Sequence, residues 1–186
     1  MKDRAPLPHF LVVAPVGRDG ELIRTLLHHT GYASQCVNTV AAVEQLEGSL
    51  ILGLILTDEA LTGDGLEALR NMVHAQPEWS DLPILLLTSG PGEPRYAAIA
   101  TQIRMEIRSL ILLDRPVRQE LLLSAVQVAY TSRLKQLEVR DAAARQTQSD
   151  EALRNSENWP WPGGWPRPWR TRSTTRSRRS GTCSTW

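Results

Sequence analysis

Five short runs of apolar residues are spaced along the first part of the chain, and each is bounded by Gly, Pro or polar residues. Runs of four to eight residues that are apolar at successive positions are typical of strands buried on both faces of a sheet. The pattern therefore predicts strands at residues 10–14, 33–37, 50–57, 83–88 and 110–113.

Between these runs, apolar residues recur three and four positions apart, which is the spacing of a helix with one buried face. Helices are expected at 21–29, 40–46, 65–73 and 96–104, with a last one from 119 onward. Alternating strands and helices predict an α/β fold with a doubly wound, five-stranded parallel sheet. The functional crevice of such a sheet lies at the carboxyl ends of its strands, after Ala14, Thr57, Thr88 and Leu113.

The last predicted helix extends beyond the domain, because no Gly or Pro interrupts residues 119–157. Its early part is expected to dock on the domain through Leu123, Val126, Tyr130, Leu134 and Leu137. We divide the chain into an N-terminal extension at 1–8, a domain at 9–130, and a helical signalling linker at 131–157 that forms a coiled coil. The alternative for the linker is a solvated tail that frays.

Residues 158–186 differ in composition from the rest, with five of the six Trp, four Pro and six Arg but no acidic residue. This segment carries a net charge of +6, whereas residues 1–157 carry 15 basic and 20 acidic residues, a net of −5. No apolar periodicity accompanies the prolines, so a disordered tail is expected.

Composition excludes several classes of site. Cys36 and Cys183 have no partner at metal-ligand spacing, and Cys36 is expected in the core. His28 and His29 are adjacent, so they lie on different faces of a helix and are poorly placed to bind one metal. No signal peptide and no apolar stretch of membrane-spanning length is present, so a cytoplasmic location without membrane contact is expected.

Three segments give the domain a family resemblance: DGLEAL at 64–69, LPILLLTS at 82–89 and DRPVRQELL at 114–122. In this order and spacing they resemble the third helix, the fourth strand and the end of the fifth strand of response-regulator receiver (CheY-like) domains. The resemblance covers residues 9–130 and implies the receiver fold, which is flavodoxin-like. It also implies a switch threonine at Thr88, and a family lysine replaced by Arg115.

The resemblance also implies an acidic pocket, from which this sequence departs. Two acids after the first strand and one after the third would hold Mg²⁺, a cation that prefers oxygen ligands. Ala14 and Pro15 stand where the acidic pair would be, and the next carboxylate is Asp19, in the loop or the first helical turn. No metal site is therefore expected.

The phosphoacceptor position is ambiguous. Counting back from Asp64-Gly65 without a gap assigns it to Thr57, whereas one deletion assigns it to Asp58. Asp58 can form an aspartyl phosphate and Thr57 cannot. The other interpretation makes Asp58 and Glu59 solvent-facing loop acids. Arg115 keeps the charge of the lysine with a different shape, and is expected to pair with Asp58, Glu59 or Asp114.

The unusual tail has two interpretations. Trp, Pro, Gly and Arg dominate GC-rich DNA when it is translated out of frame, and a shifted frame from Trp159 can spell LALAGRLAATVAHEINNPLEAVRNLLYL. That peptide resembles the histidine-bearing dimerisation helix of sensor histidine kinases, so the parent would be a kinase with an N-terminal receiver-like domain. The alternative is a nucleic-acid-binding adaptor, because Arg binds phosphate and Trp stacks on bases.

These patterns favour a regulatory module and not an enzyme. We expect a pseudo-receiver that takes part in two-component phosphorelay signal transduction without being phosphorylated, and that needs no cofactor. Its expected partners are proteins: a histidine kinase, or a second copy through the C-terminal helix, which would give a homodimer. The alternatives are a receiver that accepts phosphate on Asp58 with Mg²⁺, and the nucleic-acid adaptor.

Overall fold

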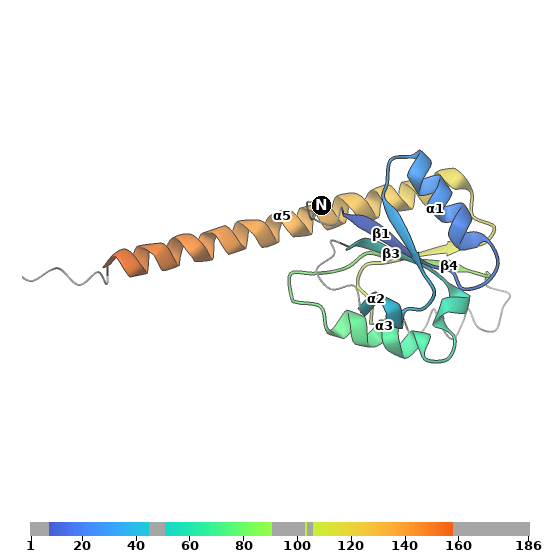
Figure 1. Cartoon of the computed structure of the whole chain (residues 1–186), viewed down its shortest axis with the longest axis horizontal. Helices are drawn as coiled ribbons and strands as arrows, with labels where there is room; N and C mark the ends of the chain where they lie inside the picture. The colour runs from blue at the N-terminus through green and yellow to red at the C-terminus, as the bar shows by residue number, and fades with distance from the viewer. Residues whose placement is uncertain (1–7, 45–50, 91–102, 104–105, 158–186) are drawn as a thin grey trace, which may run out of the picture. The chain divides into compact units, whose positions relative to one another are not determined.

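A computed structural model describes residues 8–44, 51–90, 103 and 106–157. Their core is a five-stranded, all-parallel sheet with the strand order β2-β1-β3-β4-β5 (Figure 1). The prediction of a doubly wound α/β fold with a parallel sheet is confirmed. The strands are β1 (His9–Val13), β2 (Ser34–Val37), β3 (Ile51–Thr57), β4 (Ile84–Thr88) and β5 (Leu110–Asp114).

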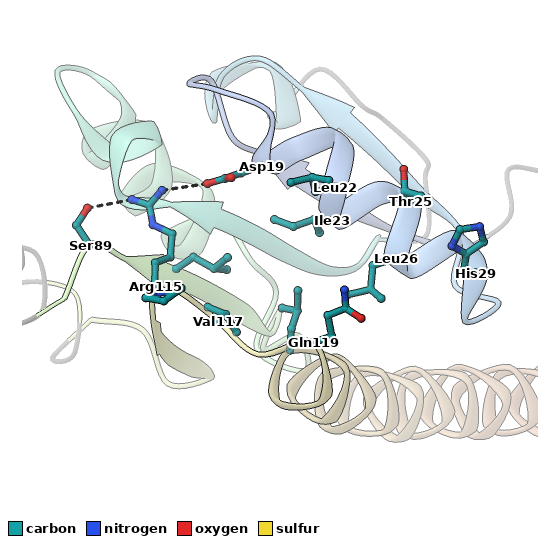
Figure 2. Close-up of a pocket in the computed structure, with 13 residues that line it drawn as sticks. Asp19, Leu22, Ile23, Thr25, Leu26, His29, Ser89, Arg115, Val117 and Gln119 are labelled. Atoms are coloured by element: carbon teal, nitrogen blue, oxygen red, sulfur yellow. Dashed lines mark hydrogen bonds and ion pairs between the residues drawn. The ribbon is translucent and has the colours of Figure 1, made fainter.

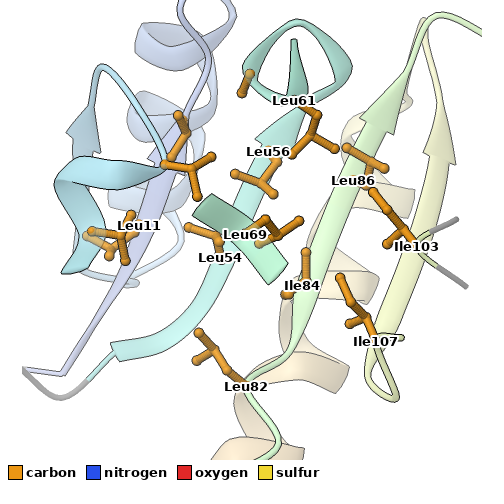
Figure 3. Packing of buried hydrophobic residues seen from close by; sticks show 14 residues of the cluster. Leu11, Leu54, Leu56, Leu61, Leu69, Leu82, Ile84, Leu86, Ile103 and Ile107 are labelled. Carbon is orange, nitrogen blue, oxygen red and sulfur yellow. The ribbon is translucent and has the colours of Figure 1, made fainter. Parts of the chain in front are cut away.

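The central strands are apolar throughout because both of their faces are buried. In β3, Leu54 and Leu56 point into one hydrophobic cluster, together with Leu69 of the helix α3, and Figure 3 shows this packing. Ile55 points into the cluster on the opposite face, with Phe10. Successive side chains of a strand alternate between the two faces of the sheet, so one apolar run supplies both clusters.

Helices cover the two faces separately. Ile23 and Leu27 of one helix and Val126 of the last helix pack in the cluster around Ile55, whereas Leu69 packs in the cluster around Leu54. The predicted helix at 96–104 lies outside the described residues except for Ile103, which is helical and buried. The described helices are α1 (Asp19–His29), α2 (Ala41–Glu44), α3 (Gly65–His74) and α5 (Gln119–Glu157).

Strand β2 is the outer neighbour of β1, and one prediction about it is wrong. Cys36 was expected in the core, but its side chain is exposed and its thiol donates to the carbonyl of Gly20 at 3.4 Å. An edge strand is buried less completely than a central one, so an apolar neighbourhood in the sequence did not imply burial here. Partial burial nevertheless raises the pKa of Cys36.

A short 3₁₀ helix, η1 (Asp58–Leu61), follows β3 directly. It is held against the start of α3, where Gly65 lies so close to the carbonyl of Ala60 that an added Cβ would collide with it. The absence of a side chain at Gly65 therefore permits the tight connection that orients Asp58 at the end of β3.

At the opposite end of the sheet, where β3 and β4 begin, α5 contacts the segment that precedes β4. We name the contacts of Trp79, Asp81, Arg133, Gln136 and Arg140 the α5 clasp. The Gln136 amide accepts from the Asp81 N–H at 3.0 Å and donates to the Asp81 carbonyl at 2.8 Å. The guanidinium groups of Arg133 and Arg140 lie 5.5 and 5.3 Å from the centre of the Trp79 ring.

Arg133 is the buried member of the clasp, with 8% of its surface exposed. It donates to the Ile51 carbonyl at 3.1 Å and to the Ser80 hydroxyl at 2.8 Å, so it joins α5 to the start of β3. Residues Asp141 to Arg154 of the same helix are exposed. Within the described part of the chain, no helix is long and apolar enough to cross a membrane.

Candidate functional site

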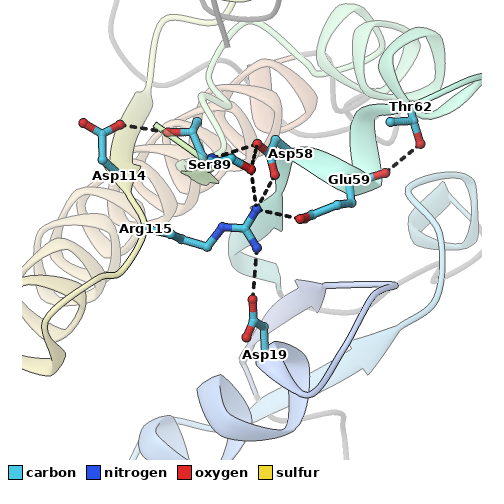
Figure 4. Close-up of polar contacts among 8 residues, drawn as sticks. Asp19, Asp58, Glu59, Thr62, Ser89, Asp114 and Arg115 are labelled. Carbon is cyan, nitrogen blue, oxygen red and sulfur yellow. Dashed lines mark hydrogen bonds and ion pairs between the residues drawn. The ribbon is translucent and has the colours of Figure 1, made fainter. Parts of the chain in front are cut away.

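The polar side chains singled out by the sequence meet at the carboxyl end of the sheet. Thr57 ends β3 and Asp58 begins η1, while Thr88 ends β4 and Asp114 ends β5. Because neighbouring strands are parallel, these carboxyl ends lie at the same end of the sheet. Arg115 follows directly after β5 (Figure 4).

Asp58 lies at the centre of this cluster and is 3% exposed. Its Oδ2 accepts from the Ser89 backbone N–H at 2.8 Å and from the Ser89 hydroxyl at 2.7 Å. Its Oδ1 accepts from Nη2 of Arg115 at 2.5 Å. Both carboxylate oxygens therefore have charged or polar donors. The interpretation of Asp58 as a solvent-facing loop acid is wrong.

Arg115 binds three carboxylates from separate parts of the chain. Its Nη1 is 3.1 Å from Oδ2 of Asp19, and its Nη2 lies 2.5 Å from Asp58 and 2.6 Å from Oε1 of Glu59. The expected pairing with Asp58 and Glu59 is found. Pairing with Asp114 is not, because the Asp114 carboxylate accepts from the Thr88 hydroxyl at 2.8 Å instead.

These contacts set the protonation of the cluster. Burial alone would raise the pKa of Asp58, but the two hydrogen bonds from Ser89, the contact with Glu59 and the charge of Arg115 outweigh it, so that this pKa lies below its ordinary value. Burial acts against the charged guanidinium, yet contact with Glu59 and the charge of Asp58 raise the pKa of Arg115 further. The cluster is thus fixed as a cation among carboxylates at neutral pH.

The two candidate acceptor positions differ in their surroundings. Thr57 is buried, and its hydroxyl has no hydrogen-bond partner among the described residues. Asp58, one residue further, is the position whose side chain enters the polar cluster. Thr88, the predicted switch position, is buried as well, and its hydroxyl donates to the Asp114 carboxylate.

The cluster does not fit the Mg²⁺ that an acidic receiver pocket would hold. Ala14 and Pro15 follow β1 and offer no carboxylate, as the sequence indicates. Asp19, the first residue of α1, contributes a carboxylate there, but it pairs with Arg115. In the described segments no group of three or more His, Cys, Asp or Glu side chains is arranged to hold a metal ion. The guanidinium of Arg115 lies between the carboxylates of Asp19, Asp58 and Glu59.

Two participants were not assigned a role from the sequence. Ser89 donates twice to Asp58 and accepts from Arg115 at 2.9 Å, and Asp19 forms the far end of the ion-pair cluster. Ser89 directly follows Thr88, the predicted switch threonine, so its position after a strand end was the available signal. Nothing local to Asp19 indicates a partner 96 positions away.

The comparisons with known proteins concern the fold. No protein-family model and no curated protein matches the chain. Among solved structures, a response regulator receiver protein from Pseudoalteromonas atlantica is similar at 18% identity, with a TM-score of 0.53, over 67% of this chain and 98% of that one. A sensor protein from Polaromonas sp. JS666 gives 19% identity and a TM-score of 0.53, over 69% and 99%.

A third similar structure is a trimeric coiled-coil segment of yeast Spc42, amino acids 181–211, fused to another structure. It is 22% identical with a TM-score of 0.56, and the likeness covers 84% of this chain and 97% of that one. At these identities the likeness shows the fold alone, which is the five-stranded parallel fold of CheY-like receiver domains.

Proposed function

We propose that this receiver-fold chain is a pseudo-receiver: a regulatory, protein-binding module of two-component phosphorelay signalling that is not itself phosphorylated. One observation carries the proposal, namely that the guanidinium of Arg115 binds Asp58, Asp19 and Glu59 together. Its positive charge balances carboxylates that would otherwise attract a metal ion.

Aspartyl phosphorylation requires a carboxylate oxygen that is free to attack and a cation that neutralises the incoming phosphoryl oxygens. Both oxygens of Asp58 already accept hydrogen bonds, from Ser89 and Arg115. A phosphoryl group would also approach Glu59, a carboxylate near the same guanidinium nitrogen. Repulsion from Glu59 and the lack of acids at Ala14 and Pro15 both oppose transfer.

A second candidate, a phosphoaccepting receiver, is favoured by the burial of Asp58 at the end of β3. Incubation with acetyl phosphate, with and without Mg²⁺, separates the two, with intact-mass spectrometry as the readout. We expect no phosphoryl adduct in either condition. An Mg²⁺-dependent adduct that disappears in Asp58→Asn would overturn the pseudo-receiver proposal and establish the alternative.

Arg115→Lys supplies a matched variant for the same experiment, because it keeps the positive charge and removes the guanidinium. A lysine cannot bridge three carboxylates with a planar fork. We expect Arg115→Lys to remain unlabelled as well, since Ala14 and Pro15 still provide no metal ligand. Labelling of this variant alone would identify Arg115, and not the missing acidic pair, as the barrier.

We also propose that the parent protein is a sensor histidine kinase and that residues 158–186, which lie outside the described residues, are out-of-frame product. Support comes from the shifted frame that spells HEINNPL, and from a helix long enough to precede a dimerisation helix. The DNA sequence from codon 150 to several hundred bases past Trp186 tests this directly. Another frame that continues through HEINNPL into an ATP-binding domain is expected. Its absence would favour the nucleic-acid adaptor.

A further inference from the structure

A groove of about 810 Å³ lies between α1 and the start of α5, beside the ion-pair cluster (Figure 2). Ligand pockets for small molecules have volumes of roughly 300–1,000 Å³, so the groove has the size of a small-molecule site.

The floor of the groove is apolar and belongs to the hydrophobic core. Ile23, Leu87 and Leu122 line it and are buried, with Leu26 and Val117 packed partly against the same cluster. Leu22 lines the groove from α1 and is 65% exposed. An apolar body placed here would cover a large exposed leucine as well as the core residues beneath it, which favours binding through the hydrophobic effect.

One end of the groove is polar and carries excess negative charge. Asp19 and Arg115 line this end, and Arg115 is already bound to Asp58 and Glu59. The cluster thus contains three carboxylates and one guanidinium. The carboxylate of Asp19 is 39% exposed and pairs with Arg115 through Oδ2. Such an end attracts a cationic head group and repels an anionic one.

We propose that this groove binds a small amphipathic amine, with its apolar body on the leucine and isoleucine floor and its ammonium group near Asp19. This goes beyond the pseudo-receiver assignment, because it gives the domain an input that does not depend on phosphate. The ammonium group would compete with Arg115 for Asp19. Occupancy of the groove would thereby change the ion pair of Asp58, because Arg115 binds both Asp58 and Asp19.

Three probes of equal chain length test the charge preference on the whole chain: octylamine, octanoate and octanol, each below its micellar concentration. Binding is measured by titration calorimetry. Octylamine is expected to bind at least about fivefold more tightly than octanoate, the ratio for one partly exposed charge pair. Octanol should fall between them. Equal or tighter binding of octanoate, or no binding of octylamine, overturns the proposal.

Three variants of α1 locate the site. Asp19→Asn should remove most of the preference for octylamine over octanoate, whereas Glu21→Gln, the same charge change on an exposed residue outside the groove, should leave it intact. Leu26→Trp should weaken all three probes by filling the floor with a bulky neutral side chain. Equal effects of Asp19→Asn and Glu21→Gln would mean that the amine is attracted by the surface in general. Circular dichroism confirms that each variant is folded before binding is compared.

Discussion

A single guanidinium binds three carboxylates at the end of the sheet, and its planar shape explains how. Arg115 directs Nη1 to Asp19 and Nη2 to Asp58 and Glu59, so one side chain reaches α1 and η1 at once. An ammonium group, with its compact charge on a flexible stem, has no such fork. Arg115 is therefore the residue around which this cluster is built.

Removing the guanidinium should leave Asp58 buried without its cation. We expect Arg115→Met to lower the free energy of unfolding by about 2–3 kcal/mol, and Arg115→Lys by about 1 kcal/mol. Urea denaturation followed by circular dichroism measures both. Arg108→Met, at an exposed arginine, is the matched control and should change stability by less than about 0.5 kcal/mol. Equal losses at both positions would contradict a special role for Arg115.

The lowered pKa of Asp58 predicts the pH dependence of stability. A carboxyl whose folded-state pKa is depressed stabilises the fold fully above its unfolded pKa of about 4, and loses that contribution as the pH falls through the folded-state value. The difference in unfolding free energy between the native chain and Asp58→Asn should therefore shrink from pH 7 to pH 3. A difference that stays constant over this range would show that Asp58 gains nothing from its charge.

At the scale of elements, all five strands were predicted. The signal was clearest for β1, β3 and β4, because a strand buried on both faces has few polar positions to obscure its apolar run, whereas the edge strand β2 carries exposed polar residues. The stripe of α5 was predicted less well. Val126 is buried as expected, but Leu122, Ala125 and Ala129 complete the buried face, and Leu123 is only partly buried. Alanines carry little signal in an apolar pattern, so the prediction followed the larger side chains instead.

The α5 clasp could not be predicted at all. Trp79 and Arg140 are far apart in the sequence, and a tryptophan before a strand has no local signature of a cation partner. Arg133 is also unusual as a buried cation that donates to the neutral oxygens of Ile51, Ser80 and Gln136. Burial and then the charge of Arg140 lower the pKa of Arg133, against a smaller effect of Asp81. Hydrogen bonds and the Trp79 ring offset part of this cost.

The clasp should hold the middle turns of α5 in place. Gln136→Ala removes both hydrogen bonds to Asp81, each worth about 1 kcal/mol, and should speed amide hydrogen exchange at residues 133–146 by about 30-fold. Lys135→Ala, an exposed neighbour on the same helix, is the control and should have little effect. Exchange in β3 and β4 should be the same in both variants. Unchanged exchange in Gln136→Ala would show that the clasp does not anchor the helix.

For the whole molecule, the class of fold followed from the order of strands and helices, and the sheet order and parallel pairing agree with it. The choice between Thr57 and Asp58 as the candidate phosphoacceptor position did not follow from the order of elements, because it depends on a shift of one residue where β3 passes into η1. Contacts of Arg133, Gln136 and Arg140 also tie residues beyond 130 to the domain. We therefore propose that the linker begins after Arg140, and not at residue 131.

This boundary changes how self-association should be tested, because deleting residues from 131 onward would remove the clasp too. Val139 is 65% exposed, and Leu153, also exposed, follows two heptads later. We expect the full chain to sediment as a dimer and Val139→Glu to sediment as a monomer. Ala144→Glu, at an exposed alanine five positions further along and on a different side of the helix, should remain dimeric. An unchanged sedimentation mass in Val139→Glu would contradict a seam on this face.

The position of Arg115 in the chain gives the cluster an order of assembly during translation. Asp19, Asp58 and Glu59 emerge from the ribosome first, and their counterion follows only after β5, the last of the described strands. Until then the nascent sheet brings negative charges together at one edge with nothing to offset them. Completion of the fold is thereby tied to the synthesis of its final strand, and a chain stalled before Arg115 would lack the residue that closes it.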